Sequence, residues 1–157
     1  MIRSTARYRT MSCAALSALA LAAVAGCTVS PESGGTLSRE EFLKQGNTIC
    51  AEGNAEIAAA VPESEDPGPP SGPEGEAFFQ TIVAVSKKQM DGVEALKAPA
   101  DLKPEVDSIL SDARASLADV EAKGSEELFA SEEDPWAAVN ERLKVIGLTE
   151  CAAEPAE

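Results

Sequence analysis

Histidine is absent from the 157-residue chain, and aromatic side chains make up only 4% of it. Because histidine is the commonest general acid–base group and the commonest metal ligand, both kinds of chemistry lose their usual residue. A haem ligand and the Glu-x-x-His pairs of a di-iron bundle are missing for the same reason. The sequence also has no Cys-x-x-Cys, Gly-x-Ser-x-Gly, Ser-x-x-Lys, calcium loop or glycine-rich phosphate loop. We therefore expect no catalytic residue, no metal site and no cofactor.

The first 26 residues have the layout of a secretory leader. Arg3, Arg7 and Arg9 precede an almost uninterrupted apolar run over residues 11–25, which is too short for a stable membrane span. This order of a basic segment, an apolar segment and small residues predicts export from the cytoplasm.

The segment Val24-Ala25-Gly26-Cys27 ends the apolar run. It resembles the lipobox of bacterial lipoproteins, in which the cysteine carries a thioether-linked diacylglycerol and fatty acids such as palmitate, and becomes the new N-terminus. The resemblance implies a lipoprotein signal peptide over residues 1–26, lipidation of Cys27, and a lipid-anchored protein on the extracytoplasmic face of the cell membrane. The alternative is an ordinary secretory signal, with Cys27 left as a free or paired thiol.

Acidic residues dominate the chain that follows the leader. The leader holds three of the 13 basic residues and none of the 27 acidic ones, so residues 27–157 have ten basic and 27 acidic residues and a net charge of −17. This charge repels nucleic acid and anionic lipid headgroups, and we expect no nucleic-acid partner. The charged residues are interpreted first as solvated helix faces, and attraction of a basic protein or a divalent cation is the alternative.

The four cysteines leave a single pairing. Cys13 lies in the leader and Cys27 takes the lipid, so Cys50 and Cys151 remain. Outside the cytoplasm two such thiols form a disulfide by default. The bridge would close a loop of about 100 residues, for which the chain-entropy contribution is roughly 4.7 kcal/mol. A redox centre or a metal site would need a second ligand or a resolving thiol that this sequence does not supply.

Helical patterning starts after a short tether over residues 27–37. Ser38 and Glu41 form a capping box, and Leu37 with Phe42 has the spacing of a hydrophobic staple. Both signals predict a helix that begins at residue 39 and continues to about residue 60.

The apolar stripe of this first predicted helix contains two glycines, Gly46 and Gly53. Each lowers helix propensity by roughly 1 kcal/mol. We therefore interpret them as positions where a neighbouring helix or the disulfide approaches closely.

A proline-rich loop is predicted over residues 62–75, which hold five prolines and three glycines. A plain spacer is favoured over an extended segment that binds a partner's groove. Apolar residues then recur at helical spacing over residues 76–97, 102–123 and 136–146, with a helical turn at 125–130. Asp101 and Asp134 are the predicted N-caps of the last two long helices, Gly147 is the predicted C-cap, and residues 152–157 are predicted to be a disordered tail.

No segment alternates with the period of a β-strand over a convincing length. Amphipathic helices joined by mostly short connections predict an all-α domain over residues 38–151, an antiparallel bundle of three to four helices closed by one disulfide.

Several short segments carry a family resemblance: Phe42, Asn47-Thr48-Ile49-Cys50, Lys97-Ala98-Pro99-Ala100-Asp101-Leu102 and Gly147-Leu148-Thr149-Glu150-Cys151. Together with the lipobox, they resemble small secreted helical lipoproteins of high-GC Gram-positive bacteria. The likeness covers residues 37–152. It implies a fold and a location, and no activity.

The function expected from these observations is a non-enzymatic binding or structural role in the cell envelope, with the lipid bilayer, an envelope protein or a glycan as partner. Trp136 and the pair Phe78-Phe79 would contact a ligand, although their helical spacing fits core positions better. The alternative function is a carboxylate-based enzyme or a metal-dependent accessory protein. In that case the runs Glu126-Glu127 and Glu132-Glu133-Asp134 are the candidate cation ligands, which we interpret first as solvated charges.

Overall fold

The computed structural model describes residues 37–62 and 70–152. The predicted leader, Cys27 and nearly all of the tether lie outside these residues. The described chain forms five α-helices and one 3-10 helix: α1 (Arg39–Ala59), α2 (Gly72–Ala95), α3 (Lys103–Lys123), α4 (Ser125–Ala130), α5 (Ala137–Ile146) and η1 (Glu150–Ala152). The predicted all-α class is confirmed. In this part of the chain none of the helices combines the length and the apolar character that crossing a bilayer requires.

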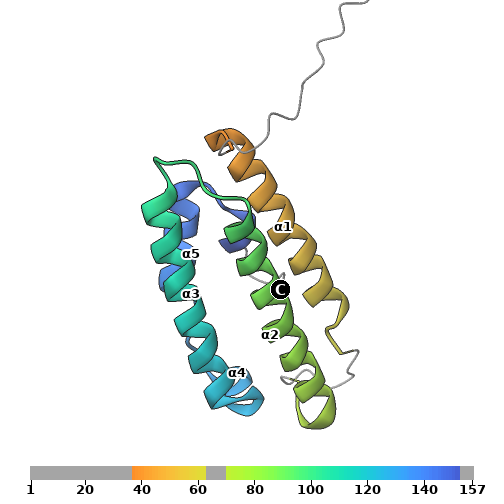
Figure 1. The fold of residues 1–157 in the computed structure, drawn as a ribbon. Helices are drawn as coiled ribbons and strands as arrows, with labels where there is room; N and C mark the ends of the chain where they lie inside the picture. Colours follow the sequence, from red (N-terminus) through yellow and green to blue (C-terminus); the bar gives the residue numbers. More distant parts are fainter. Residues whose placement is uncertain (1–36, 63–69, 153–157) are drawn as a thin grey trace, which may run out of the picture. The chain divides into compact units, whose positions relative to one another are not determined.

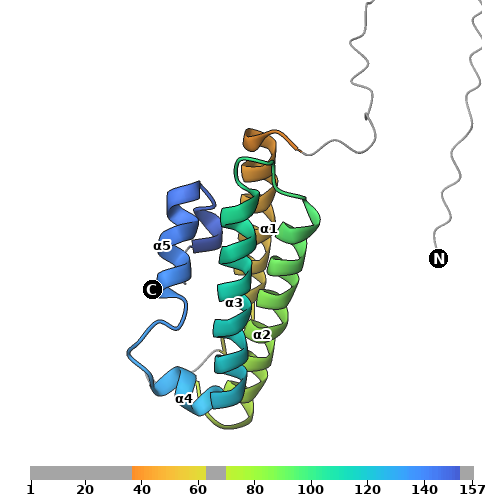
Figure 2. The same ribbon diagram turned by 60° about the vertical axis from the view of Figure 1, so that its left-hand side comes forward.

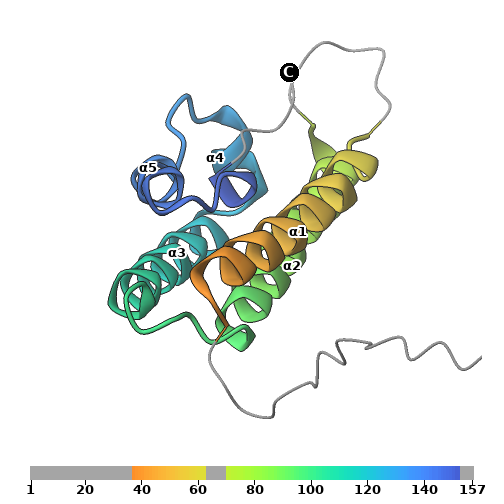
Figure 3. The same cartoon turned by 90° about the horizontal axis from the view of Figure 1, so that it is seen from above.

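The three long helices run alternately up and down beside one another (Figure 1). α5 packs against α3, on the side turned into view in Figure 2, and η1 packs against both α1 and α5 (Figure 3). The short helix α4 follows α3 and contacts α2 and α3. The predicted antiparallel bundle is therefore confirmed, with α5 as its fourth helix and α4 as the predicted helical turn.

α1 begins as the capping box predicts. The Ser38 hydroxyl accepts a hydrogen bond from the backbone N–H of Glu41, and the Glu41 carboxylate accepts one from the backbone N–H of Ser38. Leu37, assigned to the tether by the sequence, is partly buried against the core cluster that contains Phe42. The ordered domain thus includes the last residue of the predicted tether.

α2 begins four residues earlier than its apolar pattern predicts, so the predicted loop 62–75 is wrong in its last four residues. Pro73 stands in the first turn, where its missing N–H costs no helical hydrogen bond and its fixed φ favours the helix. Gly75 is buried at this turn, and a β-carbon there would lie 2.7 Å from the carbonyl group of Pro70. A proline breaks a helix only when it lies beyond the first turn. The proline and glycine content of this segment therefore predicted a start of α2 that is too late.

The predicted N-cap of α3 is also wrong. Leu102 occupies the cap position, and Asp101 instead forms an ion pair with Arg39 of α1 at 3.1 Å. The carbonyl of Pro99 accepts hydrogen bonds from the backbone N–H groups of Leu102 and Lys103, so a turn precedes the helix and Asp101 lies within that turn.

The predicted cap of α5 is displaced in a similar way. Trp136 occupies the N-cap, and Asp134 accepts a hydrogen bond from the Trp136 backbone N–H at 2.8 Å in the turn before the helix. The C-cap prediction is confirmed. Gly147 adopts a left-handed φ of 100°, and its N–H and that of Leu148 both donate to the carbonyl of Leu143.

The core has two parts. The larger part lies among α1, the C-terminal half of α2, α3, α5 and the chain end, and the smaller part lies among the N-terminal half of α2, the C-terminal half of α3, α4 and Trp136. The larger cluster consists of Phe42, Cys50, Val93, Ala98, Leu102, Val106, Ile109, Leu110, Ala113, Val139, Ile146 and Leu148, and the smaller of Phe79, Val83, Leu117 and Val120.

The end of the chain is held against α1. Ala152 is only 2% exposed, so the predicted disordered tail is wrong at its first residue, and residues 153–157 lie outside the described ones. The predicted close approaches at the two glycines are confirmed. A β-carbon at Gly53 would lie 2.3 Å from Nε2 of Gln89 on α2, and Gly46 faces Leu148 in the same manner.

Candidate functional site

The predicted disulfide between Cys50 and Cys151 is present. The two sulfur atoms are 1.99 Å apart, and the two α-carbons are 4.8 Å apart. Cys50 belongs to the larger core cluster, and Cys151 packs against that cluster from η1. The bridge therefore joins the middle of α1 to η1, the last described helix.

Asparagine side chains reinforce this junction. The amide nitrogen of Asn47 donates to the carbonyl of Gly147 at 2.9 Å, and its Oδ1 accepts the backbone N–H of Glu150 at 2.9 Å. About two turns further along α1, Asn54 donates to the carbonyl of Glu150 at 2.7 Å. Both residues thus supply partners to backbone groups that follow the end of α5.

Gln89 extends the same network to α2. Its Nε2 donates to the carbonyl of Cys50 at 2.9 Å and to Oδ1 of Asn54 at 3.2 Å. These amides have no role that the sequence predicts. The available signal was the low helix propensity of asparagine, which makes two of them inside one helix unusual unless they bond elsewhere. The partners of these hydrogen bonds lie on α1 and at the chain end, so the three amides hold these segments together.

The aromatic residues divide between the core and the surface. Phe79 is 4% exposed and belongs to the smaller core cluster, against which Trp136 is partly buried. Phe78 is half-buried and stacks on Phe129 of α4, with the ring centroids 5.8 Å apart and the planes 13° from parallel. The core interpretation therefore holds for Phe79, and Phe78 is the member of the pair that a ligand can reach.

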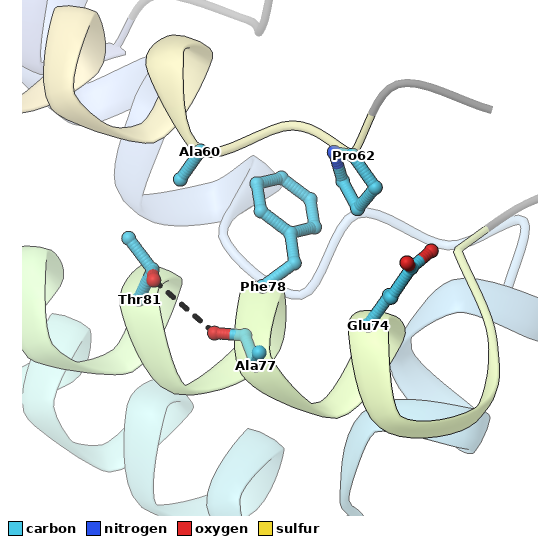
Figure 4. A pocket seen from close by; sticks show the side chains of 6 residues that line it. All are labelled: Ala60, Pro62, Glu74, Ala77, Phe78 and Thr81. Carbon is cyan, nitrogen blue, oxygen red and sulfur yellow. Dashed lines mark hydrogen bonds between the residues drawn. The ribbon is translucent and has the colours of Figure 1, made fainter.

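A first groove lies between the end of α1 and the start of α2 (Figure 4). It has a volume of about 420 Å³ and is lined by Ala60, Pro62, Glu74, Ala77, Phe78 and Thr81. The ring of Phe78 projects between Ala60 and Pro62, while Glu74 stands at the rim. The hydroxyl of Thr81 donates to the carbonyl of Ala77 within the helix, so this polar side chain of the lining already has a partner.

A second groove of about 540 Å³ lies between the start of α2 and α4. Its lining comes from both segments: Pro70, Ser71, Gly72, Pro73, Glu76, Ser125, Glu126, Phe129 and Ala130. Phe78 lines the first groove, and Phe129 lines the second. Because their rings stack, the two side chains form a wall that the two grooves share. We call this surface, the two grooves with Phe78 and Phe129, the aromatic end.

Among the residues that the structure describes, the ionisable side chains that line the aromatic end are all acidic: Glu74, Glu76 and Glu126. Hydrogen bonds from the Gln80 amide and then from the Ser125 hydroxyl hold the pKa of Glu76 below its usual range. Glu76 therefore carries its negative charge firmly, and the hydrogen bond from Ser125 at 2.8 Å also ties α4 to α2.

The predicted cation ligands are not brought together. Glu126, Glu127, Glu132 and Glu133 are all exposed, and Asp134 is occupied by hydrogen bonds from Trp136 and Asn140. Within residues 37–62 and 70–152, no three His, Cys, Asp or Glu side chains gather as a metal-binding group.

Two arginine side chains away from the aromatic end form ion pairs that join neighbouring helices. Arg114 of α3 pairs with Asp91 and Glu94 of α2, and Arg142 of α5 pairs with Glu105 and Asp112 of α3. The hydrogen bond that Arg142 donates to the Glu105 carboxylate is the main cause that raises the pKa of Arg142. These pairs are exposed to solvent, so they orient the helices more than they stabilise the fold.

Comparison of the chain with protein-family models, curated proteins and solved structures gave no match.

Proposed function

We propose that this chain is a lipoprotein anchored to the extracytoplasmic face of the cell membrane through Cys27, and that its helical domain acts by binding, without a chemical step. The observation that carries the proposal is the Cys50–Cys151 disulfide. Structural disulfides persist in oxidising compartments and are rare where glutathione keeps thiols reduced. The bridge thus supports the export that the basic and apolar leader predicts.

The sequence supports the anchor and limits the partners. The lipobox-like segment ending at Cys27 and the resemblance to small secreted helical lipoproteins both favour an acylated N-terminus in the bilayer. The charge of −17 opposes contact with nucleic acid or anionic headgroups. The remaining partners are an envelope protein or a glycan.

The electrostatics of the described carboxylates support binding over catalysis. A carboxylic acid that donates a proton near neutral pH needs a raised pKa, usually from burial or a second acid. The pKa values of Glu41 and Glu76 are lowered instead, by hydrogen bonds from Ser38 and from Gln80 with Ser125 respectively. Glu76, which lines the second groove, is therefore suited to attract a cationic partner.

Detergent phase partitioning tests the anchor. We expect the wild type to enter the detergent phase and Cys27→Ser to stay in the aqueous phase. Cys13→Ser is the matched control, because it makes the same change inside the leader and should partition as the wild type does. Equal partitioning of the wild type and Cys27→Ser into water would overturn the lipid anchor.

Calorimetric titration with calcium, magnesium, manganese and zinc tests the absence of a required metal. We expect no stoichiometric site tighter than roughly 10⁻⁵ M, the weak limit of calcium sensors. Such a site, abolished by glutamine at positions 126, 127, 132 and 133, would replace the binding role with a metal-dependent one.

A further inference from the structure

We propose that the aromatic end is a docking surface for a basic segment of another envelope protein, in which lysine or arginine residues flank an apolar side chain. This inference rests on the proposed binding function and names the class of partner. Its elements are the stacked pair Phe78 and Phe129, the grooves on either side of the pair, and the acidic rim.

The aromatic pair supplies the apolar anchor point. Phe78 and Phe129 are half-buried, so part of each ring stays accessible while the stack fixes its orientation. Rigid aromatic side chains at the centre of a patch contribute strongly to binding because little side-chain entropy is lost on association. The two grooves offer space beside each ring for a leucine- or phenylalanine-sized side chain.

The negative charge around the grooves favours a positively charged partner. Residues 70–86 and 124–134 contain seven acidic residues and neither lysine nor arginine. Lys123, which directly precedes the second of these ranges in the sequence, forms an ion pair with Asp119 at 2.9 Å. The carboxylates of Glu127 and Glu133 also raise the pKa of Lys123, after the larger effect of Asp119, which places both acids near this end of α3.

A basic peptide segment fits this surface better than the other partner classes. Anionic lipid and nucleic acid are repelled, and a neutral glycan makes no use of the charge. A peptide with flanking lysines gains Coulomb attraction, a faster association and contact of its cations with the aromatic faces. The surface therefore fits a protein segment that has an apolar centre and basic flanking residues.

A labelled peptide tests this proposal on the mature chain in phosphatidylcholine nanodiscs. The probe is fluorescein-labelled Lys-Leu-Lys-Phe-Lys-Leu-Lys, measured by fluorescence anisotropy with empty nanodiscs as the blank. Two comparison peptides replace the lysines with glutamate or the apolar residues with serine. We expect saturable binding of the first peptide only, and equal binding of any comparison peptide would overturn the proposal.

Matched variants separate the aromatic end from the general charge of the protein. Glu74→Gln with Glu126→Gln removes two acids at the rim, and Glu40→Gln with Glu52→Gln removes two exposed acids elsewhere on the bundle. We expect several-fold weaker binding for the first pair and less than a twofold change for the second. Equal weakening of binding by the two double variants would mean that the peptide responds only to the net charge of the protein. That result would overturn the proposed docking surface.

Two single changes test the geometry. Phe78→Ala should weaken binding about tenfold, in the range of a hot-spot residue, with the melting temperature checked in parallel. Glu74→Lys, at an exposed position that leaves the core untouched, should weaken binding at low salt and lose most of its effect at high salt. Unchanged affinity in either variant would overturn the proposal.

The outcome is independent of the anchor. The peptide reports on the helical domain, so a chain that partitions into water would overturn the lipid anchor and leave this test valid in solution. Normal partitioning without peptide binding would overturn the docking surface alone.

Discussion

Gly46 lies against Leu148 so closely that a β-carbon at position 46 would stand 2.6 Å from Cδ2 of the leucine. Leu148 is 1% exposed and belongs to the larger core cluster, so it has little room to move. The contact brings the chain end onto α1 directly before the disulfide. Glycine is therefore required here by packing, since helix propensity alone favours alanine by roughly 1 kcal/mol.

Gly46→Ala should destabilise the domain by about 1–2 kcal/mol, because overpacking costs more than the gain in propensity. Urea denaturation measures the change. Ala55→Gly, at an exposed position of the same helix, reports propensity alone. In a Leu148→Ala background the penalty of Gly46→Ala should largely vanish, and a stabilising Gly46→Ala in the wild type would contradict the close approach.

Removal of the disulfide should lower the free energy of unfolding by about 2–5 kcal/mol. The double variant Cys50→Ala with Cys151→Ala avoids a free thiol, and its urea midpoint is compared with that of the oxidised and the reduced wild type. The reduced wild type should resemble the double variant. An oxidised wild type no more stable than either would show that the bridge closes a loop without stabilising the fold.

Asn47→Ala should cost about 1–3 kcal/mol, because it leaves the Gly147 carbonyl and the Glu150 N–H without their partner. Amide hydrogen exchange should accelerate selectively at Glu150. Thr48→Ala is the neighbouring control, since the Thr48 hydroxyl bonds only to the Lys44 carbonyl of its own helix. Equal effects of the two substitutions would argue against a specific role for Asn47.

The pKa of Glu76 should lie below 4.5 in the wild type and rise toward that value in Gln80→Ala, with a smaller rise in Ser125→Ala. A lowered pKa in the folded state means that the contribution to stability is complete above pH 4.5 and is lost as pH falls through the folded value. Carboxyl titration by NMR measures the change. The pKa of Glu41, which depends on Ser38, should not respond, and a fixed Glu76 value would contradict the assigned hydrogen bonds.

Local signals in the sequence predicted the helices well, and positions where two segments meet were predicted less well. The Ser38–Glu41 capping box, the Gly147 C-cap and the Cys50–Cys151 pair each follow from residue chemistry at fixed spacing, and all three are confirmed. Asp101 failed as a cap because Arg39, far away in the chain, offers it an ion pair.

The candidate surface shows the same division between local and distant contacts. The apolar pattern of α2 marks both Phe78 and Phe79 as core residues. Phe79 is buried in the smaller core cluster with Leu117 and Val120 of α3, whereas Phe78 is only half-buried and stacks on Phe129 of α4. Phe129 meets Phe78 across a gap of 51 residues in sequence, which no helical periodicity encodes. The acidic residues of the rim could be recognised from the sequence. Their position beside the grooves could be known only from the folded structure.

The bridge between Cys50 and Cys151 spans 101 residues of sequence, and every connection between helices lies inside this span. A single backbone cleavage anywhere between the two cysteines therefore leaves one covalent molecule. The nicked domain would run as an intact chain on a non-reducing gel and as two fragments after reduction. On a surface exposed to proteases, this arrangement keeps the halves of a damaged molecule together and attached to the same N-terminal segment.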